Sequence, residues 1–229
     1  MPAPLAQFAL RLPFLPRKRL LAIDPGGNCV KLLLVEEVLN RPQIVRHELI
    51  EIQSAGLLSE EEVLRHAQDV IQDLGQYPIA LAIPHYRALS QTMDLPNAEP
   101  QEIRRLIEAE TVKLSGLGES NIVYDYVALQ PYGRHSNPFW VTLCREAEIQ
   151  SQVQRCGLAG LDLCEVTTTA NGLTTSYLAQ EPDADQIVLV DFGATGTVLV
   201  ILYRGQAIYA SHFALGGDAL TDTIVSTQG

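Results

Sequence analysis

Residues 20–35, LLAIDPGGNCVKLLLV, predict a strand, a tight turn and a second strand. The proline fixes φ for the turn, and the two glycines permit positive φ and a close approach of the backbone to a ligand. A carboxylate beside bare glycine amides suits a phosphate that carries a metal ion. Taken alone, an Asp-Pro-Gly-Gly turn more often does no more than connect two strands.

A second stretch repeats this design near the other end of the sequence. Residues 187–200, IVLVDFGATGTVLV, again place four apolar residues before an aspartate, Asp191, and then a glycine-rich turn and an apolar strand. A third strand is predicted after each hairpin, at residues 43–52 and 207–212. The repetition favours a duplicated phosphate-binding element over two unrelated turns.

The composition excludes several classes of function. The 229 residues carry a net charge of −11, which argues against non-specific binding of nucleic acid but not against a nucleotide. No apolar run is long enough to cross a bilayer. The four cysteines show no CxxC spacing, which is typical of free thiols in a reducing, cytoplasmic setting. The sequence contains no HExxH motif and no nucleophile elbow, so zinc and hydrolase functions are not favoured.

The region between the two repeats has the pattern of an α/β module. Helices are predicted where apolar residues recur at helical spacing, at residues 59–74, 101–114, 146–156 and 167–178. Strands are predicted at residues 79–83, 88–95, 122–129, 139–144 and 161–166, and a helix begins at residues 219–225. Residues 1–19 combine apolar side chains with a basic cluster, which fits either a loose terminus or an anchor for a membrane surface or a partner.

Two meanders that each open with an apolar run and Asp-x-Gly resemble the actin-like ATPase fold, an α/β fold of the ribonuclease H-like type. Within that fold the sequence most resembles the PilM family, the FtsA-like cytoplasmic proteins of type IV pilus assembly. The resemblance rests on the motifs Ile83-Pro84, MDLP at residues 93–96, VYDY at 123–126, DFGAT at 191–195 and LGGDALT at 215–221.

This resemblance implies two lobes that clamp a nucleotide and an inserted subdomain of the FtsA/PilM type. The implied division is an N-terminal tail, a first lobe in two pieces, the inserted α/β subdomain and the start of an incomplete second lobe: residues 1–19, 20–87 with 164–180, 88–163, and 181–229. Members of the family continue beyond the equivalent of Gly229. We therefore expect the 229-residue form to be a fragment that binds nucleotide weakly or not at all.

The resemblance also assigns residues to a site for ATP and Mg²⁺. Asp24 and Asp191 would hold Mg²⁺, which prefers hard oxygen ligands and keeps several waters. Glu165 is the candidate for activating water, although a structural role for this carboxylate is equally open. The residues expected to contact the nucleotide are Asp24, Gly26, Gly27, Lys31, Asp191, Gly193, Ala194, Thr195, Gly216 and Gly217.

By the same resemblance the partner is the cytoplasmic tail of a PilN-like inner-membrane protein. The tail would lie in a groove involving the strand near residues 88–95 and the helix from Gln101. We expect a cytoplasmic protein at the inner face of the inner membrane, associated with it indirectly, without nucleic acid, and with self-association as a further implication. ATP binding would gate partner binding, with at most weak ATPase activity.

Several residues depart from the family pattern and leave alternatives open. Pro25, Gly27 and Cys29 occupy the first turn, where a hydroxyl residue is usual, Gly196 replaces one in the second turn, and Thr167 stands where a second acid is common. One alternative is an actin-fold ATPase or small-molecule kinase, which needs a general base near the γ-phosphate. The other is a nucleotide-free structural homologue, similar to the cytoplasmic domain of GspL in type II secretion.

Overall fold

The computed structural model describes residues 19–38, 41–51, 77–116, 121–181 and 185–228, and every structural statement below concerns these residues. The N-terminal tail and the helix predicted at residues 59–74 lie outside them. None of the described helices is long and apolar enough to cross a membrane.

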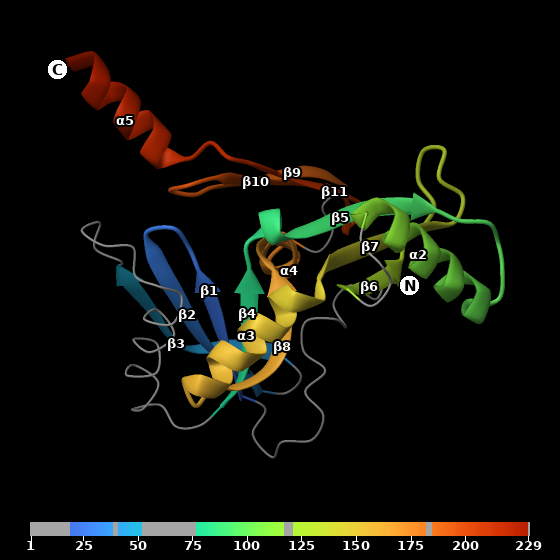
Figure 1. Cartoon of the computed structure of the whole chain (residues 1–229), viewed down its shortest axis with the longest axis horizontal. Helices are drawn as coiled ribbons and strands as arrows, with labels where there is room; N and C mark the ends of the chain where they lie inside the picture. The colour runs from blue at the N-terminus through green and yellow to red at the C-terminus, as the bar shows by residue number, and fades with distance from the viewer. Residues whose placement is uncertain (1–18, 39–40, 52–76, 117–120, 182–184, 229) are drawn as a thin grey trace.

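The first sheet has five strands in the order β3-β2-β1-β4-β8 (Figure 1). Its strands are β1 (Arg19–Pro25), β2 (Cys29–Val38), β3 (Arg41–Glu51), β4 (Pro78–Ile83) and β8 (Asp162–Thr168). Strands β1, β2 and β3 form the predicted antiparallel meander, whereas β4 and β8 run parallel to β1. The carboxyl ends of β1, β4 and β8 therefore meet at one edge, which is where ligands bind in open α/β sheets.

Successive side chains of β1 point to opposite faces of the first sheet, and one of these faces is the core. Leu21 and Ile23 are both 1% exposed and belong to a core that includes Cys156 of helix α3 (Glu146–Leu158). Side chains alternate across a strand, so Asp24 lies on the opposite face from Ile23. The core residues thus fix the register that places Asp24 at the carboxyl edge.

The second sheet has three strands in the order β5-β7-β6 and one covering helix. Its elements are β5 (Ala88–Asp94), α2 (Pro100–Ser115), β6 (Ile122–Ala128) and β7 (Pro138–Arg145). The short 3₁₀ helix η2 (His85–Arg87) joins β4 to β5. Helix α2 packs through Ile103 and Ile107 onto Met93, Phe139 and Val141.

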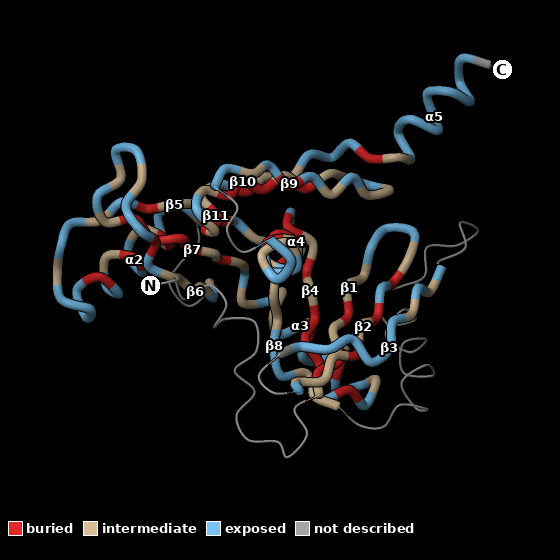
Figure 2. The backbone as a smooth tube through the Cα atoms, turned by 180° about the vertical axis from the view of Figure 1, so that it is seen from behind, coloured by how far each residue is buried: buried red, intermediate tan, exposed pale blue. Residues whose placement is uncertain are grey.

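The third sheet repeats the antiparallel meander, in the order β11-β10-β9. It is built from β9 (Gln186–Phe192), β10 (Thr197–Tyr203) and β11 (Gln206–Phe213), preceded by α4 (Thr169–Leu178) and followed by α5 (Gly217–Gln228). Its core joins α4 with Trp140 of β7, so the second and third sheets share one apolar cluster. Figure 2 shows the buried residues along β10, and α5 exposed and extending away from the sheets.

One predicted boundary differs from the structure. Helix α3 continues through Gly157 to Leu158, rather than ending at residue 156, because this glycine keeps helical geometry and the turn follows at Ala159 and Gly160. The predicted division placed α3 in the inserted subdomain. Its buried Cys156 packs on the first sheet, and the helix also contacts β6 and β7 of the second sheet. The boundaries of that division stay predictions.

Candidate functional site

The two Asp-Gly turns lie against each other. A Cβ atom on Gly27 would stand 2.8 Å from Cγ2 of Thr195, so any larger residue would force the Thr195 side chain or one of the turns to shift. Asn28 Nδ2 donates to Asp218 Oδ1 at 3.3 Å, which ties the first turn to the start of α5. The duplicated turns therefore form one site rather than two.

A lysine supplies positive charge at the first turn. Lys31 stands opposite Asp24 in the β1–β2 ladder, and its Nζ lies 3.2 Å from Asp24 Oδ2. Burial alone would lower the pKa of Lys31, but attraction to Asp24, and then to Asp191 and Cys29, raises the pKa overall. The ammonium group is therefore charged at neutral pH, paired with Asp24 of the first turn and attracted to Asp191 of the second.

The Leu-Gly-Gly-Asp segment, residues 215–218, packs against the second turn and forms hydrogen bonds with its backbone. Gly217 N donates to Gly193 O at 3.0 Å, and Asp218 N donates to Ala194 O at 2.9 Å. A Cβ on Gly216 would overlap the Ala194 carbonyl. Gly216 and Gly217 thus hold the shape of the turn, and their direct contact with a nucleotide stays a prediction.

Only some of the amides in the two turns are available to a ligand. Gly26 N donates to Cys29 O at 2.8 Å and Gly193 N donates to Gly196 O at 3.0 Å, so these two amides close their own turns. Within the described ranges, the turn amides of Gly27, Asn28, Ala194, Thr195 and Gly196 have no backbone acceptor. These are the donors that a phosphate oxygen could use, and they include the predicted Gly27, Ala194 and Thr195.

The residues at the turns fit a magnesium–phosphate group better than a metal bound by protein alone. No group of three or more His, Cys, Asp or Glu side chains in the described part of the chain could hold a metal ion. Mg²⁺ is commonly bound by one or two carboxylates together with phosphate oxygens and water. Asp24 and Asp191 could supply those carboxylates, while Lys31 and the free amides would contact phosphate.

Glu165 lies on the same sheet face as Asp24 but at some distance. It is paired with Ala80, which is paired with Ala22, two residues before Asp24 in β1. Two strands and two residues separate the Cα atoms by about 12 Å. The carboxyl is exposed, yet partial burial still raises its pKa. Its role toward water stays a prediction.

The sequence did not indicate the histidines beside the second turn. His212 of β11 lies on Gly196, where a Cβ atom would overlap His212 Nε2, and its ring packs against Tyr86 in a tilted arrangement with the centroids 5.2 Å apart. His85 is 4% exposed, and burial, with the charge of His212, lowers its pKa. The one signal in the sequence was Gly196 itself, because a residue without a side chain leaves room for another group beside the turn.

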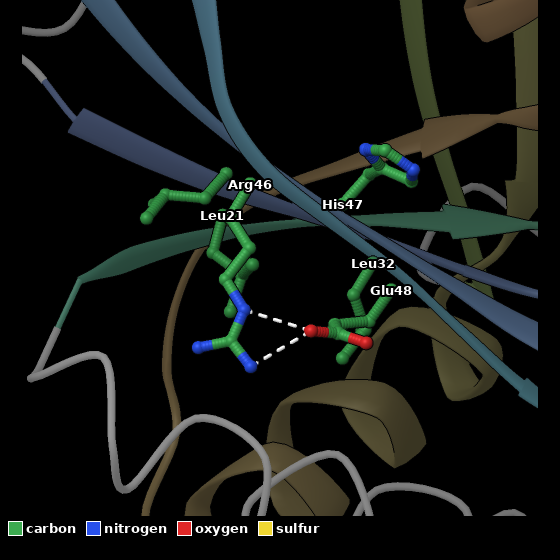
Figure 3. Close-up of a pocket in the computed structure, with 6 residues that line it drawn as sticks. Leu21, Leu32, Arg46, His47 and Glu48 are labelled. Carbon is green, nitrogen blue, oxygen red and sulfur yellow. Dashed lines mark hydrogen bonds and ion pairs between the residues drawn. The ribbon is translucent and has the colours of Figure 1, made fainter.

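A groove of about 400 Å³ lies between β5 and α2. The groove is formed by β5 and α2, the same two segments that are expected from the sequence to contact the partner's tail. Its lining is Gln91, Thr92, Met93, Asp94, Leu95, Pro96, Leu106, Glu110 and Leu114. A depression beside β3 (Figure 3) is lined instead by core leucines and the Arg46–Glu48 ion pair, and it offers no comparable space for a ligand.

Two repeated meanders whose aspartate turns meet, with an α/β unit inserted between them, define the actin-like ATPase fold. Residues 28–229 match the family model described as type IV pilus assembly protein PilM. The chain belongs to the PilM family, and the sequence-based prediction of fold and family is confirmed.

Solved structures show the same fold at low sequence identity. A "PilM-PilN type IV pilus biogenesis complex" matches with a TM-score of 0.75 and 18% identity over 93% of this chain and 66% of that chain. The cytoplasmic domain of EpsL, an inner-membrane component of the type II secretion system of Vibrio cholerae, matches with a TM-score of 0.56 and 9% identity over 84% of this chain and 71% of that domain. The present chain spans just under two thirds of the PilM chain.

Proposed function

We propose that the chain is a scaffold of type IV pilus assembly that binds Mg-ATP between its two aspartate turns and docks the cytoplasmic tail of a PilN-like inner-membrane protein. It would act in the cytoplasm at the inner face of the inner membrane, to which the partner's tail attaches it. The single observation that carries the nucleotide part is the meeting of the two turns, with Lys31 influenced by carboxylates from both.

The chemistry of the turns supports a phosphate ligand. Unengaged amides from both turns and one ammonium group would contact the phosphates, while two carboxylates would lie beside them. The carboxylates would repel a bare triphosphate and attract its magnesium complex. The site therefore favours Mg-ATP over metal-free ATP.

The chemistry of the β5–α2 groove supports a short extended peptide. Leu106, Glu110 and Leu114 follow each other at intervals of four residues, so they form one stripe about 12 Å long on α2. Met93, Leu95 and Pro96 face the groove from the β5 side. An extended peptide of about four residues spans that length and would bury apolar side chains there.

Placing a charge in the groove is expected to abolish docking. With Leu106→Asp, the affinity for a synthetic peptide copying the N-terminal tail of the PilN protein of the same organism should fall at least about tenfold, because an unpaired carboxylate would be desolvated next to Glu110. Isothermal titration calorimetry measures the change, and circular dichroism verifies folding.

The matched control is Val153→Asp, which adds the same charge on α3 at a side chain that is 54% exposed and outside the groove. Its affinity for the peptide should equal that of the wild type. Equal binding by the Leu106→Asp and wild-type proteins would contradict the proposed location of the docking groove.

A further inference from the structure

We infer that strand β11 couples the β5–α2 groove to the second phosphate turn, so that a peptide in the groove stabilises the turn. The inference rests on the docking part of the proposed function. Three contacts along β11 carry it, at Ile208, at Gln206 and at His212.

The first contact links β11 to the groove through a β-bulge. In the β10–β11 ladder, Ile201 is opposite Tyr209 and Leu202 is opposite Ala207, so Ile208 has no partner on β10. Its carbonyl instead accepts a hydrogen bond of 3.0 Å from Oγ1 of Thr92, which lines the groove. Bulges commonly redirect backbone groups in this way at functional positions. A ligand that fixes Thr92 would therefore also fix the bulge.

The second contact fixes the start of β11 to the same subdomain. Gln206 is 2% exposed, and its side chain bonds the backbone of Gln130 twice: Oε1 accepts from Gln130 N at 2.7 Å and Nε2 donates to Gln130 O at 3.2 Å. A buried amide with both groups satisfied resists displacement. The first residue of β11 is therefore fixed to the second sheet. A displacement of β5 would displace the bulge at Ile208 and, with it, the rest of the strand.

The third contact reaches the phosphate turn. His212 lies four residues beyond the bulge and rests on Gly196, which accepts the hydrogen bond that closes the turn from Gly193. Tyr86 of η2 also packs against the His212 ring, with the centroids 5.2 Å apart. The imidazole contacts both η2 and the turn, so a shift of β11 must move the turn or break this packing. The unengaged amides of Ala194 and Thr195 would move with it.

Amide hydrogen exchange followed by mass spectrometry tests this coupling without any nucleotide. In the wild type, the same synthetic PilN-tail peptide should slow exchange several-fold in the groove, along residues 206–213 and at residues 193–196. Each variant is measured at a peptide concentration that saturates its own groove. Thr92→Val, which removes the bond to Ile208 together with the one that Thr92 Oγ1 accepts from the Tyr132 hydroxyl, should confine protection to the groove. His212→Ala should extend protection along β11 but leave residues 193–196 unprotected.

Thr142→Val is the matched control, because its hydroxyl bonds Ser90 within the second sheet and not β11. Its pattern should match the wild type. Protection confined to the groove in the wild type, or protection of the turn in Thr92→Val, would refute the coupling while leaving docking intact. A wild-type protein that does not bind the peptide would refute docking and the coupling with it.

Discussion

Replacing either aspartate of the two turns by alanine is expected to weaken Mg-ATP binding at least about tenfold, which corresponds to 1.4 kcal/mol. Asp24 and Asp191 are the carboxylates that the turns place near Lys31, and Mg²⁺ in phosphate sites depends on one or two such ligands. Losing either one removes a ligand and leaves the lysine less well neutralised.

Metal-free ATP should respond in the opposite direction to these substitutions. In Asp24→Ala, Lys31 loses the ion pair of 3.2 Å and becomes available to a phosphate oxygen, while one repulsive carboxylate disappears. The preference for Mg-ATP over ATP should therefore fall in both variants. This reversal separates a metal-ligand role from general damage to the fold.

Calorimetric titration with ATP, in the presence and absence of magnesium, measures both effects. The matched control is Asp162→Ala, because Asp162 is exposed and begins β8 at the opposite edge of the first sheet. It should bind Mg-ATP like the wild type. If all three variants bind equally well, the aspartate turns do not form the metal–phosphate site.

A single methyl group at Gly216 is expected to destabilise the protein by about 1–3 kcal/mol. The Cβ atom of Gly216→Ala would overlap the carbonyl of Ala194 and approach that of Gly193, and both are backbone atoms that cannot rotate away. The second turn or the start of α5 must move, which also displaces the amides offered to phosphate. Urea unfolding followed by circular dichroism measures the loss as a lower midpoint.

Gly172→Ala provides the control for the same substitution. Gly172 lies inside α4, and no atom comes within 4 Å of a Cβ built there. Alanine is preferred over glycine in helices, so this variant should gain about 0.5–1 kcal/mol. A Gly216→Ala protein as stable as the wild type would show that the close packing behind the turn is not required.

The sequence predicted the repeated meanders well because apolar alternation and turn residues encode them locally. Residues 20–35 folded into β1, the turn and β2, and residues 187–200 into β9, the turn and β10. Helix α2 and strand β5 were also predicted, so the groove between them coincides with the expected docking segments.

The sequence could not predict which atoms meet across distant segments. The contact of Gly27 with Thr195 and the bond from Asn28 to Asp218 join residues far apart in the chain, and no spacing rule encodes them. Helix α3 contacts both β8 of the first sheet and β6 and β7 of the second, a double packing that its apolar spacing did not reveal. His212 went unnoticed because a lone histidine in a strand carries no pattern.

The central claim is that the two turns together bind the phosphates of a nucleotide. It is tested at the backbone amides of the turns, which would donate to the phosphate oxygens. The most direct measurement is a titration of the chain with Mg-ATP, followed by amide proton–nitrogen correlation NMR, which detects even weak binding at named residues. We predict progressive shifts at Gly27, Ala194 and Thr195, three of the turn amides that no backbone acceptor engages in the described structure. Unchanged positions of these three amides at millimolar Mg-ATP would contradict the account.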